Sequence, residues 1–177
     1  MSENSDSTQM PGPTVIISGS APSVQPQTNL VLGFDRDEAS NVALEVARDL
    51  ADRLHAYLAV VHIVNLSDYP IDSDSPDWER QARLTLDEER SRVQRALVGY
   101  RFGWSYEARY GLPVDVLLEV AEERDAFLIV VGRHGHGVSE GLRRLIDGSV
   151  SRRLMKRCAR PVLVVPSGNA AKIDTTA

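Results

Sequence analysis

The chain has little cysteine and no long apolar run, and these two features disfavour a disulfide-bonded protein and a membrane-spanning one. Cys158 is the only cysteine among 177 residues, so no disulfide can form within the chain and we expect a reducing, cytoplasmic compartment. No apolar run approaches the roughly 20 residues that a membrane-spanning helix requires. The first 27 residues have no charged-then-apolar signal-peptide pattern. We therefore expect no membrane partner.

Positive charge is not in excess either. The net charge is −5 and the isoelectric point is about 5.4, which disfavours bulk attraction to nucleic acid or to an anionic membrane. With 42% apolar and 25% charged residues, the composition is that of a soluble globular protein. The basic residues are nevertheless unevenly placed. One stretch holds Arg143, Arg144, Arg152, Arg153, Lys156, Arg157 and Arg160.

Several catalytic and phosphate-binding motifs are missing. The sequence contains no G-x-x-x-x-G-K-[ST] P-loop, and no G-x-G-x-x-G follows its first predicted strand. It also lacks a G-x-S-x-G nucleophile elbow. No Cys–His pair and no acid/base pair is discernible, so the sequence shows no catalytic machinery.

What the sequence does have is an alternation of strand-like and helix-like segments. Strands are predicted at 29–34, 57–64, 104–110, 127–131 and 162–165, and helices at 38–54, 77–100, from 113 onward and at 149–160. This order predicts an α/β fold with an open, five-stranded parallel sheet and helices on both faces. Strand 104–110 alternates in the manner of a strand, with Trp104, Tyr106, Ala108 and Tyr110 on one face, which favours an edge strand with one less buried face.

We expect one domain, residues 28–166, between two tails. Residues 1–27 are rich in Ser, Pro, Gln and Gly, a composition that predicts a disordered tail. Residues 167–177 are predicted to form a shorter, flexible tail.

The most informative stretch is 126–166. An apolar run, residues 127–131, stops at Gly132, a glycine-rich loop follows, and Gly148-Ser149 then opens a basic amphipathic helix. A buried strand, a glycine-rich loop and a helix N-terminus together form the usual anion site of α/β folds. Backbone N–H groups of such a loop can converge on one phosphate group. The stretch therefore predicts nucleotide binding.

Individual residues of this site have structural alternatives. Gly132 and Gly135 allow close backbone approach, or only a sharp turn after the strand. Ser149 suits a helix N-cap as well as a phosphate contact. Asp35 follows the first strand, where it would cap the next helix or contact a ribose hydroxyl or a metal ion.

The histidines do not predict a metal site. His134 and His136 are two residues apart, but no nearby Cys or Glu completes a ligand set. His55 and His62 are interpreted as structural residues.

These features together resemble the universal stress protein (UspA) family, in its ATP-binding subgroup, over residues 29–166. The most specific matches are Val131-Gly132-Arg133-His134-Gly135, Gly148-Ser149-Val150-Ser151 and Arg160-Pro161 followed by the strand 162–166. Supporting matches are Gly33-Phe34-Asp35, Glu38-Ala39-Ser40 and Val61-His62-Ile63-Val64.

The resemblance implies a Rossmann-like fold of the adenine nucleotide alpha-hydrolase-like type, with strand order 3-2-1-4-5, and ATP or a related adenine nucleotide as a regulatory ligand in stress adaptation. It implies ligand contacts from Gly33, Asp35, Ile63, Val131, Gly132, His134, Gly135, Gly148, Ser149, Val150 and Ser151. Asp35 would contact the ribose or a phosphate, Ile63 would pack near the adenine, and the segment 148–151 would hold phosphates. It also implies a homodimer formed through the last strand, Val162 to Val165. Any ATP hydrolysis would be slow, because no positioned base is visible. Whether Mg²⁺ accompanies the nucleotide stays open.

One departure keeps alternatives open. Twelve residues separate Gly135 from Gly148, three more than the nine of the family pattern, and Asp147 places a carboxylate beside the phosphate segment. The second hypothesis is therefore a dimeric interaction module of the same fold that has lost nucleotide binding. A third, an adenylate-forming or ATP-pyrophosphatase enzyme, ranks last, since the residues 33–37 do not match the S-G-G-x-D-S-type loop of those enzymes.

Overall fold

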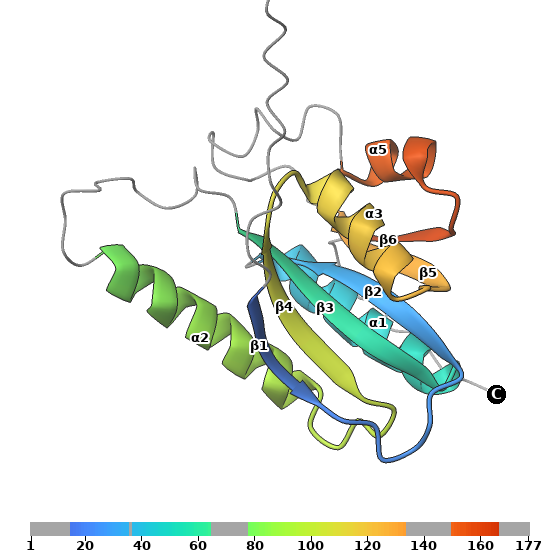
Figure 1. Cartoon of the computed structure of the whole chain (residues 1–177), viewed down its shortest axis with the longest axis horizontal. Coiled ribbons are helices and arrows are strands. Elements are labelled where there is room, and N and C mark those ends of the chain that lie inside the picture. Colours follow the sequence, from blue (N-terminus) through green and yellow to red (C-terminus); the bar gives the residue numbers. More distant parts are fainter. Residues whose placement is uncertain (1–14, 36, 65–77, 134–149, 167–177) are drawn as a thin grey trace, which may run out of the picture.

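The computed structural model describes residues 15–35, 37–64, 78–133 and 150–166, and Figure 1 shows their arrangement. The strands are β1 (Val15–Ser20), β2 (Thr28–Phe34), β3 (Ala56–Val64), β4 (Trp104–Tyr110), β5 (Leu128–Arg133) and β6 (Val162–Pro166). The helices are α1 (Glu38–Arg53), α2 (Trp78–Ala96), α3 (Pro113–Glu123) and α5 (Val150–Arg157). The α/β class and the alternation of elements predicted from the sequence are confirmed.

The sheet has six strands in the order β1-β4-β3-β2-β5-β6. The five predicted strands are β2 to β6, and they pair in parallel in the expected order 3-2-1-4-5. The prediction of five strands is wrong by one, because residues 15–20, assigned to the tail, pair antiparallel with β4. Val15, Ile16 and Ile17 are β-branched residues that favour a strand once an open sheet edge is available to pair with.

Because β1 covers it, β4 is an inner strand rather than the predicted edge. Every residue of β4 up to Arg109 is buried. The face that was expected to be more exposed carries Ser105, Glu107 and Arg109, which are also buried. The alternation in β4 therefore separates an apolar face from a polar, buried one.

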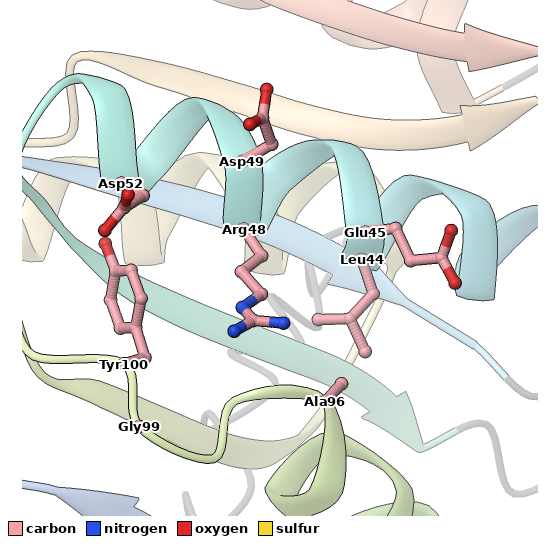
Figure 2. Close-up of a pocket in the computed structure, with 8 residues that line it drawn as sticks. All are labelled: Leu44, Glu45, Arg48, Asp49, Asp52, Ala96, Gly99 and Tyr100. Atoms are coloured by element: carbon pink, nitrogen blue, oxygen red, sulfur yellow. The ribbon is translucent and has the colours of Figure 1, made fainter.

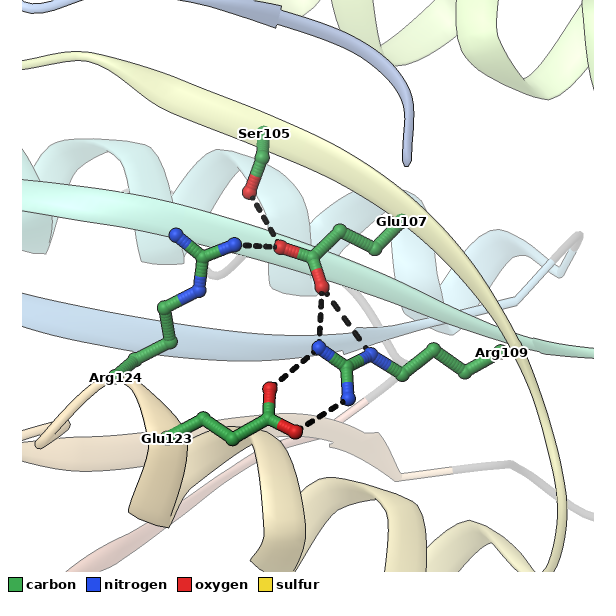
Figure 3. Close-up of polar contacts among 5 residues, drawn as sticks. All are labelled: Ser105, Glu107, Arg109, Glu123 and Arg124. Carbon is green, nitrogen blue, oxygen red and sulfur yellow. Dashed lines mark hydrogen bonds and ion pairs between the residues drawn. The ribbon is translucent and has the colours of Figure 1, made fainter. Parts of the chain in front are cut away.

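Figure 3 shows the hydrogen bonds and ion pairs made by the polar side chains of this face. The Glu107 carboxylate, fully buried, accepts hydrogen bonds from Ser105 Oγ at 2.9 Å, from Arg109 Nη2 at 2.9 Å and from Arg124. Arg109 also donates to both oxygens of Glu123, at 3.0 and 2.6 Å. These hydrogen bonds from Arg109 hold the pKa of Glu123 below its usual range. Two carboxylates and two guanidinium groups thus compensate one another beside the end of α3.

Helices cover both faces of the sheet. On one face α1 and α2 pack against alternate strand residues, such as Leu32, Val60 and Tyr106. On the other face α3 and α5 pack against the intervening residues, such as Val31, Val61 and Ile129. Figure 1 shows α3 and α5 together on one side and α1 on the other. This burial of both faces explains why the central strands read as continuous apolar runs.

Candidate functional site

The candidate site is assembled where three parallel strands end side by side. Gly33 of β2 is in register with Val61 of β3 on one side and with Val131 of β5 on the other. Neighbouring strands lie about 4.8 Å apart, so the ends of β2, β3 and β5 form one continuous edge. In open α/β sheets, ligands bind outside the carboxyl ends of the strands, where the strand order reverses. That reversal occurs here between β2 and β5.

Five predicted site residues are brought to this edge: Gly33, Asp35, Ile63, Val131 and Gly132. Ile63 is partly buried and packs against the cluster that lies under α3. Val131 is 5% exposed, so its side chain belongs to the core. Asp35 directly follows β2 and is half-buried.

The remaining predicted residues divide into two groups. Val150 and Ser151 form the first turn of α5, which returns from β5 to the parallel strand β6 and therefore begins at the carboxyl ends of the strands. A helix N-terminus carries partial positive charge, which favours an anion there. His134, Gly135, Gly148 and Ser149 lie outside the described residues, as do Asp147 and the lengthened segment between the glycines.

The two glycines of the described edge have packing roles. A Cβ at Gly132 would lie 2.9 Å from the carbonyl oxygen of Ala39 and 3.2 Å from the backbone nitrogen of Ser40. Gly132 therefore lets the first turn of α1 lie directly against β5. A Cβ at Gly33 would meet Leu117 of α3 at 3.1 Å and Val131 at 3.3 Å. Each glycine brings a helix close to the strands that carry the site.

Asp37, and not Asp35, caps the helix that follows β2. The Asp37 carboxylate accepts a hydrogen bond from the Ser40 backbone N–H at 2.8 Å. The Ser40 hydroxyl in turn accepts one from the Asp35 backbone N–H at 3.0 Å. Asp37 thus caps the helix in place of Asp35, and the backbone N–H of Asp35 is hydrogen-bonded to α1.

A buried polar cluster under this edge was missed by sequence reasoning. His62 Nδ1 lies 3.2 Å from Glu89 Oε2 and 3.4 Å from the carbonyl oxygen of Phe34. Tyr106 donates its hydroxyl proton to the same oxygen of Glu89 at 2.7 Å. The three residues are at most 3% exposed. His62 was interpreted as structural, but no spacing rule links it to a carboxylate on α2, so the sequence offered no signal for the pair.

A separate groove lies between α1 and the segment after α2, and Figure 2 shows it. Its volume is about 440 Å³, and Leu44, Ala96 and Tyr100 supply its apolar surface. Three carboxylates and one guanidinium group also line it, from Glu45, Asp49, Asp52 and Arg48. Excess negative charge disfavours a phosphate, so this groove is not a candidate for the nucleotide site. Burial, together with nearby Asp52, raises the pKa of Tyr100 above its usual range.

The described ranges contain neither a membrane-spanning helix nor a cluster of metal ligands. No helix in them is both long and apolar enough to cross a membrane. Within the same residues, no group of three or more His, Cys, Asp or Glu side chains is arranged to hold a metal ion.

A six-stranded, mostly parallel sheet with helices on both faces and a reversal of strand order between β2 and β5 defines a Rossmann-like α/β domain. Residues 28–166 match the sequence model of the universal stress protein family. The chain belongs to this family, as the motifs around Gly132 indicated.

Relatives at the sequence level are found in bacteria and archaea. A universal stress protein from Mycolicibacterium smegmatis is 32% identical over 168 residues, which is 87% of this chain and 51% of that protein. Universal stress protein MJ0531 from Methanocaldococcus jannaschii is 30% identical over 135 residues, which is 72% of this chain and 77% of that protein. The chain thus spans about half the length of its mycobacterial relative.

Solved structures share the fold. A universal stress protein in complex with cyclic AMP is 28% identical, with a TM-score of 0.54, over 78% of this chain and 95% of the other. The protein MJ0577 has a TM-score of 0.62 at 19% identity, over 81% and 99% of the two chains. A universal stress protein from Archaeoglobus fulgidus in complex with dAMP has a TM-score of 0.50 at 22% identity, over 81% and 98%. Adenine nucleotides are therefore ligands within this family.

Proposed function

We propose that this chain is a cytoplasmic universal stress protein that binds an adenine nucleotide, with ATP as the expected ligand, and responds to it in stress adaptation. The proposal is carried by the convergence of Asp35, Ile63 and Val131 at the reversal of strand order. It is supported by the relative that holds cyclic AMP at 28% identity.

Each part of the nucleotide has a matching group. The Asp35 carboxylate would accept hydrogen bonds from ribose hydroxyls, and Ile63 offers apolar surface to the adenine. Val131 and Gly132, near the end of β5, would lie beside the ribose. The phosphates would be surrounded by His134, Gly135, Gly148, Ser149, Val150 and Ser151. The first turn of α5 adds the favourable end of a helix dipole. Mg²⁺ takes carboxylate and phosphate oxygens as ligands, so Asp35 also suits a metal–nucleotide complex.

Titration calorimetry tests the proposal with ATP, ADP, AMP and cyclic AMP, each with and without Mg²⁺. Saturable heat is expected for the wild type, and Asp35→Ala should weaken binding about tenfold through the loss of a charged hydrogen-bond acceptor. Asp49→Ala is the matched control, because this carboxylate lies on α1 and is paired with Arg53 at 2.8 Å beside the separate groove. The double variant Gly135→Ala, Gly148→Ala should abolish phosphate-dependent heat. An absence of wild-type heat at millimolar nucleotide would contradict the proposal.

A specific observation favours the second candidate, a dimeric interaction module without nucleotide. Twelve residues between Gly135 and Gly148, together with Asp147, change the segment expected to hold the phosphates. Added loop length is inexpensive, whereas a carboxylate beside a phosphate is repulsive. Under this alternative no nucleotide binds the wild type, and Asp147→Asn with three loop residues removed restores binding.

We also expect a homodimer formed through β6. Among the described residues this strand pairs with β5 alone, and Leu163 is 37% exposed. An apolar strand with an unpaired edge is a template for pairing with a second copy. Sedimentation velocity should show a dimer for the wild type and a monomer for Leu163→Lys. Val98→Lys replaces a residue that is 69% exposed after α2, and should leave the dimer intact.

A further inference from the structure

The peptide group between Phe34 and Asp35 is held from two sides by buried side chains. Its carbonyl oxygen lies 3.4 Å from His62 Nδ1 on β3. Its N–H donates to the Ser40 hydroxyl on α1 at 3.0 Å. His62 and Ser40 are each 3% exposed, so water does not compete freely for either contact. A peptide plane fixed at both its C=O and its N–H sets the position of the Asp35 Cα and of the N–Cα bond, and so limits the directions open to the Asp35 side chain.

The His62 side of this arrangement is itself anchored. Phe34 O and Glu89 Oε2 are both acceptors, and both face Nδ1, so this nitrogen carries the proton. Glu89 comes from α2 and is also held by the Tyr106 hydroxyl at 2.7 Å. The ring of His62 is thereby oriented by groups on α2 and β4, neither of which carries a predicted site residue.

We propose that His62 and Ser40 are positioning residues that clamp the Phe34–Asp35 peptide and thereby preset Asp35 for the ribose of the bound nucleotide, with Glu89 and Tyr106 orienting His62. This inference rests on the proposed nucleotide binding and adds to it the residues that set its affinity without touching the ligand. Asp35 leaves a strand end, where the backbone is less constrained than inside the ladder. The clamp constrains this strand end before the ligand arrives, which lowers the entropic cost of binding.

The test combines calorimetry with amide hydrogen exchange followed by NMR. His62→Leu should weaken nucleotide binding about tenfold, the effect of losing one hydrogen bond near a charged group, and should accelerate exchange of the Asp35 amide. His62→Asn retains a nitrogen donor near the position of Nδ1 and should restore both values toward the wild type. Ser40→Ala removes the other half of the clamp with a small truncation, and should reproduce both effects if His62→Leu does not fold.

Tyr100→Phe is the control for a merely structural role. Tyr100 is buried in the same apolar cluster, and its hydroxyl donates to the carbonyl oxygen of Ala56 at the opposite end of β3. The variant should lower stability without changing nucleotide affinity or Asp35 exchange. Unchanged affinity in His62→Leu and Ser40→Ala, with a wild type that binds, overturns the clamp alone. A wild type that binds no nucleotide overturns the proposed function and the positioning role with it. In that case, exchange of the Asp35 amide in the variants still shows whether His62 and Ser40 hold the Phe34–Asp35 peptide.

Discussion

Gly132 gives the sharpest test of how the described part of the site is built. In Gly132→Ala the new methyl group would lie 2.9 Å from Ala39 O, 3.0 Å from Ala39 C and 3.2 Å from Ser40 N. All three are backbone atoms of the first turn of α1, so no side chain can rotate away. The turn must move, and Ser40 and the Asp37 cap must move with it.

The change in the free energy of unfolding for Gly132→Ala follows from two opposing effects. Overpacking of a rigid contact costs about 1–3 kcal/mol. Replacing glycine by alanine restricts the unfolded chain and returns about 0.4–1 kcal/mol. We therefore expect Gly132→Ala to lower the free energy of unfolding by about 1–2 kcal/mol, and to weaken nucleotide binding because the Asp35 N–H loses its aligned acceptor.

Urea denaturation followed by circular dichroism measures the first effect, and calorimetry measures the second. Gly99→Ala is the control, because nothing lies within 4 Å of its added methyl and only its φ of +75° is unfavourable. It should cost about 1 kcal/mol from backbone conformation and leave affinity unchanged. A Gly132→Ala protein as stable as the wild type would refute the packing role assigned to Gly132.

The polar network on β4 gives two further predictions. Glu107→Gln should lower the free energy of unfolding by about 3 kcal/mol, since it leaves two guanidinium groups facing a fully buried neutral side chain, and thermal denaturation checks this value. Glu123→Gln should cost only about 0.5 kcal/mol at pH 7, because the Glu123 side chain is 45% exposed and the ion pair is screened. The Arg109 hydrogen bonds lower the pKa of Glu123, so its contribution is present above the unfolded pKa near ~4.3 and is lost as the pH falls through the folded value. Urea titrations should show the stabilities of the two proteins converging as the pH falls through the lowered folded-state pKa of Glu123, and a constant difference across pH would contradict the assignment.

The central sheet was predictable because its strands are buried on both faces. Runs such as Leu30 to Leu32 and Leu128 to Val131 are apolar at every position, a pattern typical of parallel strands between two helical layers. Helix ends were less predictable. The longer helix was expected to reach residue 100 but ends at Ala96, because the apolar residues Leu97 and Tyr100 continue its spacing from a turn beyond the helix.

The two fold errors share one cause. A strand at residues 15–20 lies within a Ser- and Pro-rich segment, and nothing local indicates that an open edge on β4 exists to pair with it. Once that strand is missed, β4 is predicted as an edge strand with one less buried face, and that face carries Glu107 and Arg109. Their burial depends on Glu123 and Arg124, which the sequence places beyond an intervening turn.

At the candidate site, the sequence motifs identified residues but not the contacts that hold those residues in place. Gly132 was chosen as a phosphate-loop residue, and the structure shows a backbone contact with α1. Asp35 was given two roles, and the cap belongs to Asp37. Contacts of this kind join elements distant in sequence, so only the register of the strands and the packing of α1 and α2 reveal them.

The buried contacts of His62, Ser40 and Gly132 all lie near the half of the site that would hold the nucleoside. His62, Ser40 and Gly132 fix the ends of β2 and β5 through buried contacts that do not involve the segment between Gly135 and Gly148. We therefore expect a longer segment to act on the phosphates more than on Asp35 and Ile63. If the longer segment weakens contacts to the phosphates that ATP has and AMP lacks, ATP loses its advantage over AMP. A ratio of AMP to ATP dissociation constants near one would locate the defect in the loop. Weak binding of both that is not restored by Asp147→Asn with three loop residues removed would place the defect in the strand ends.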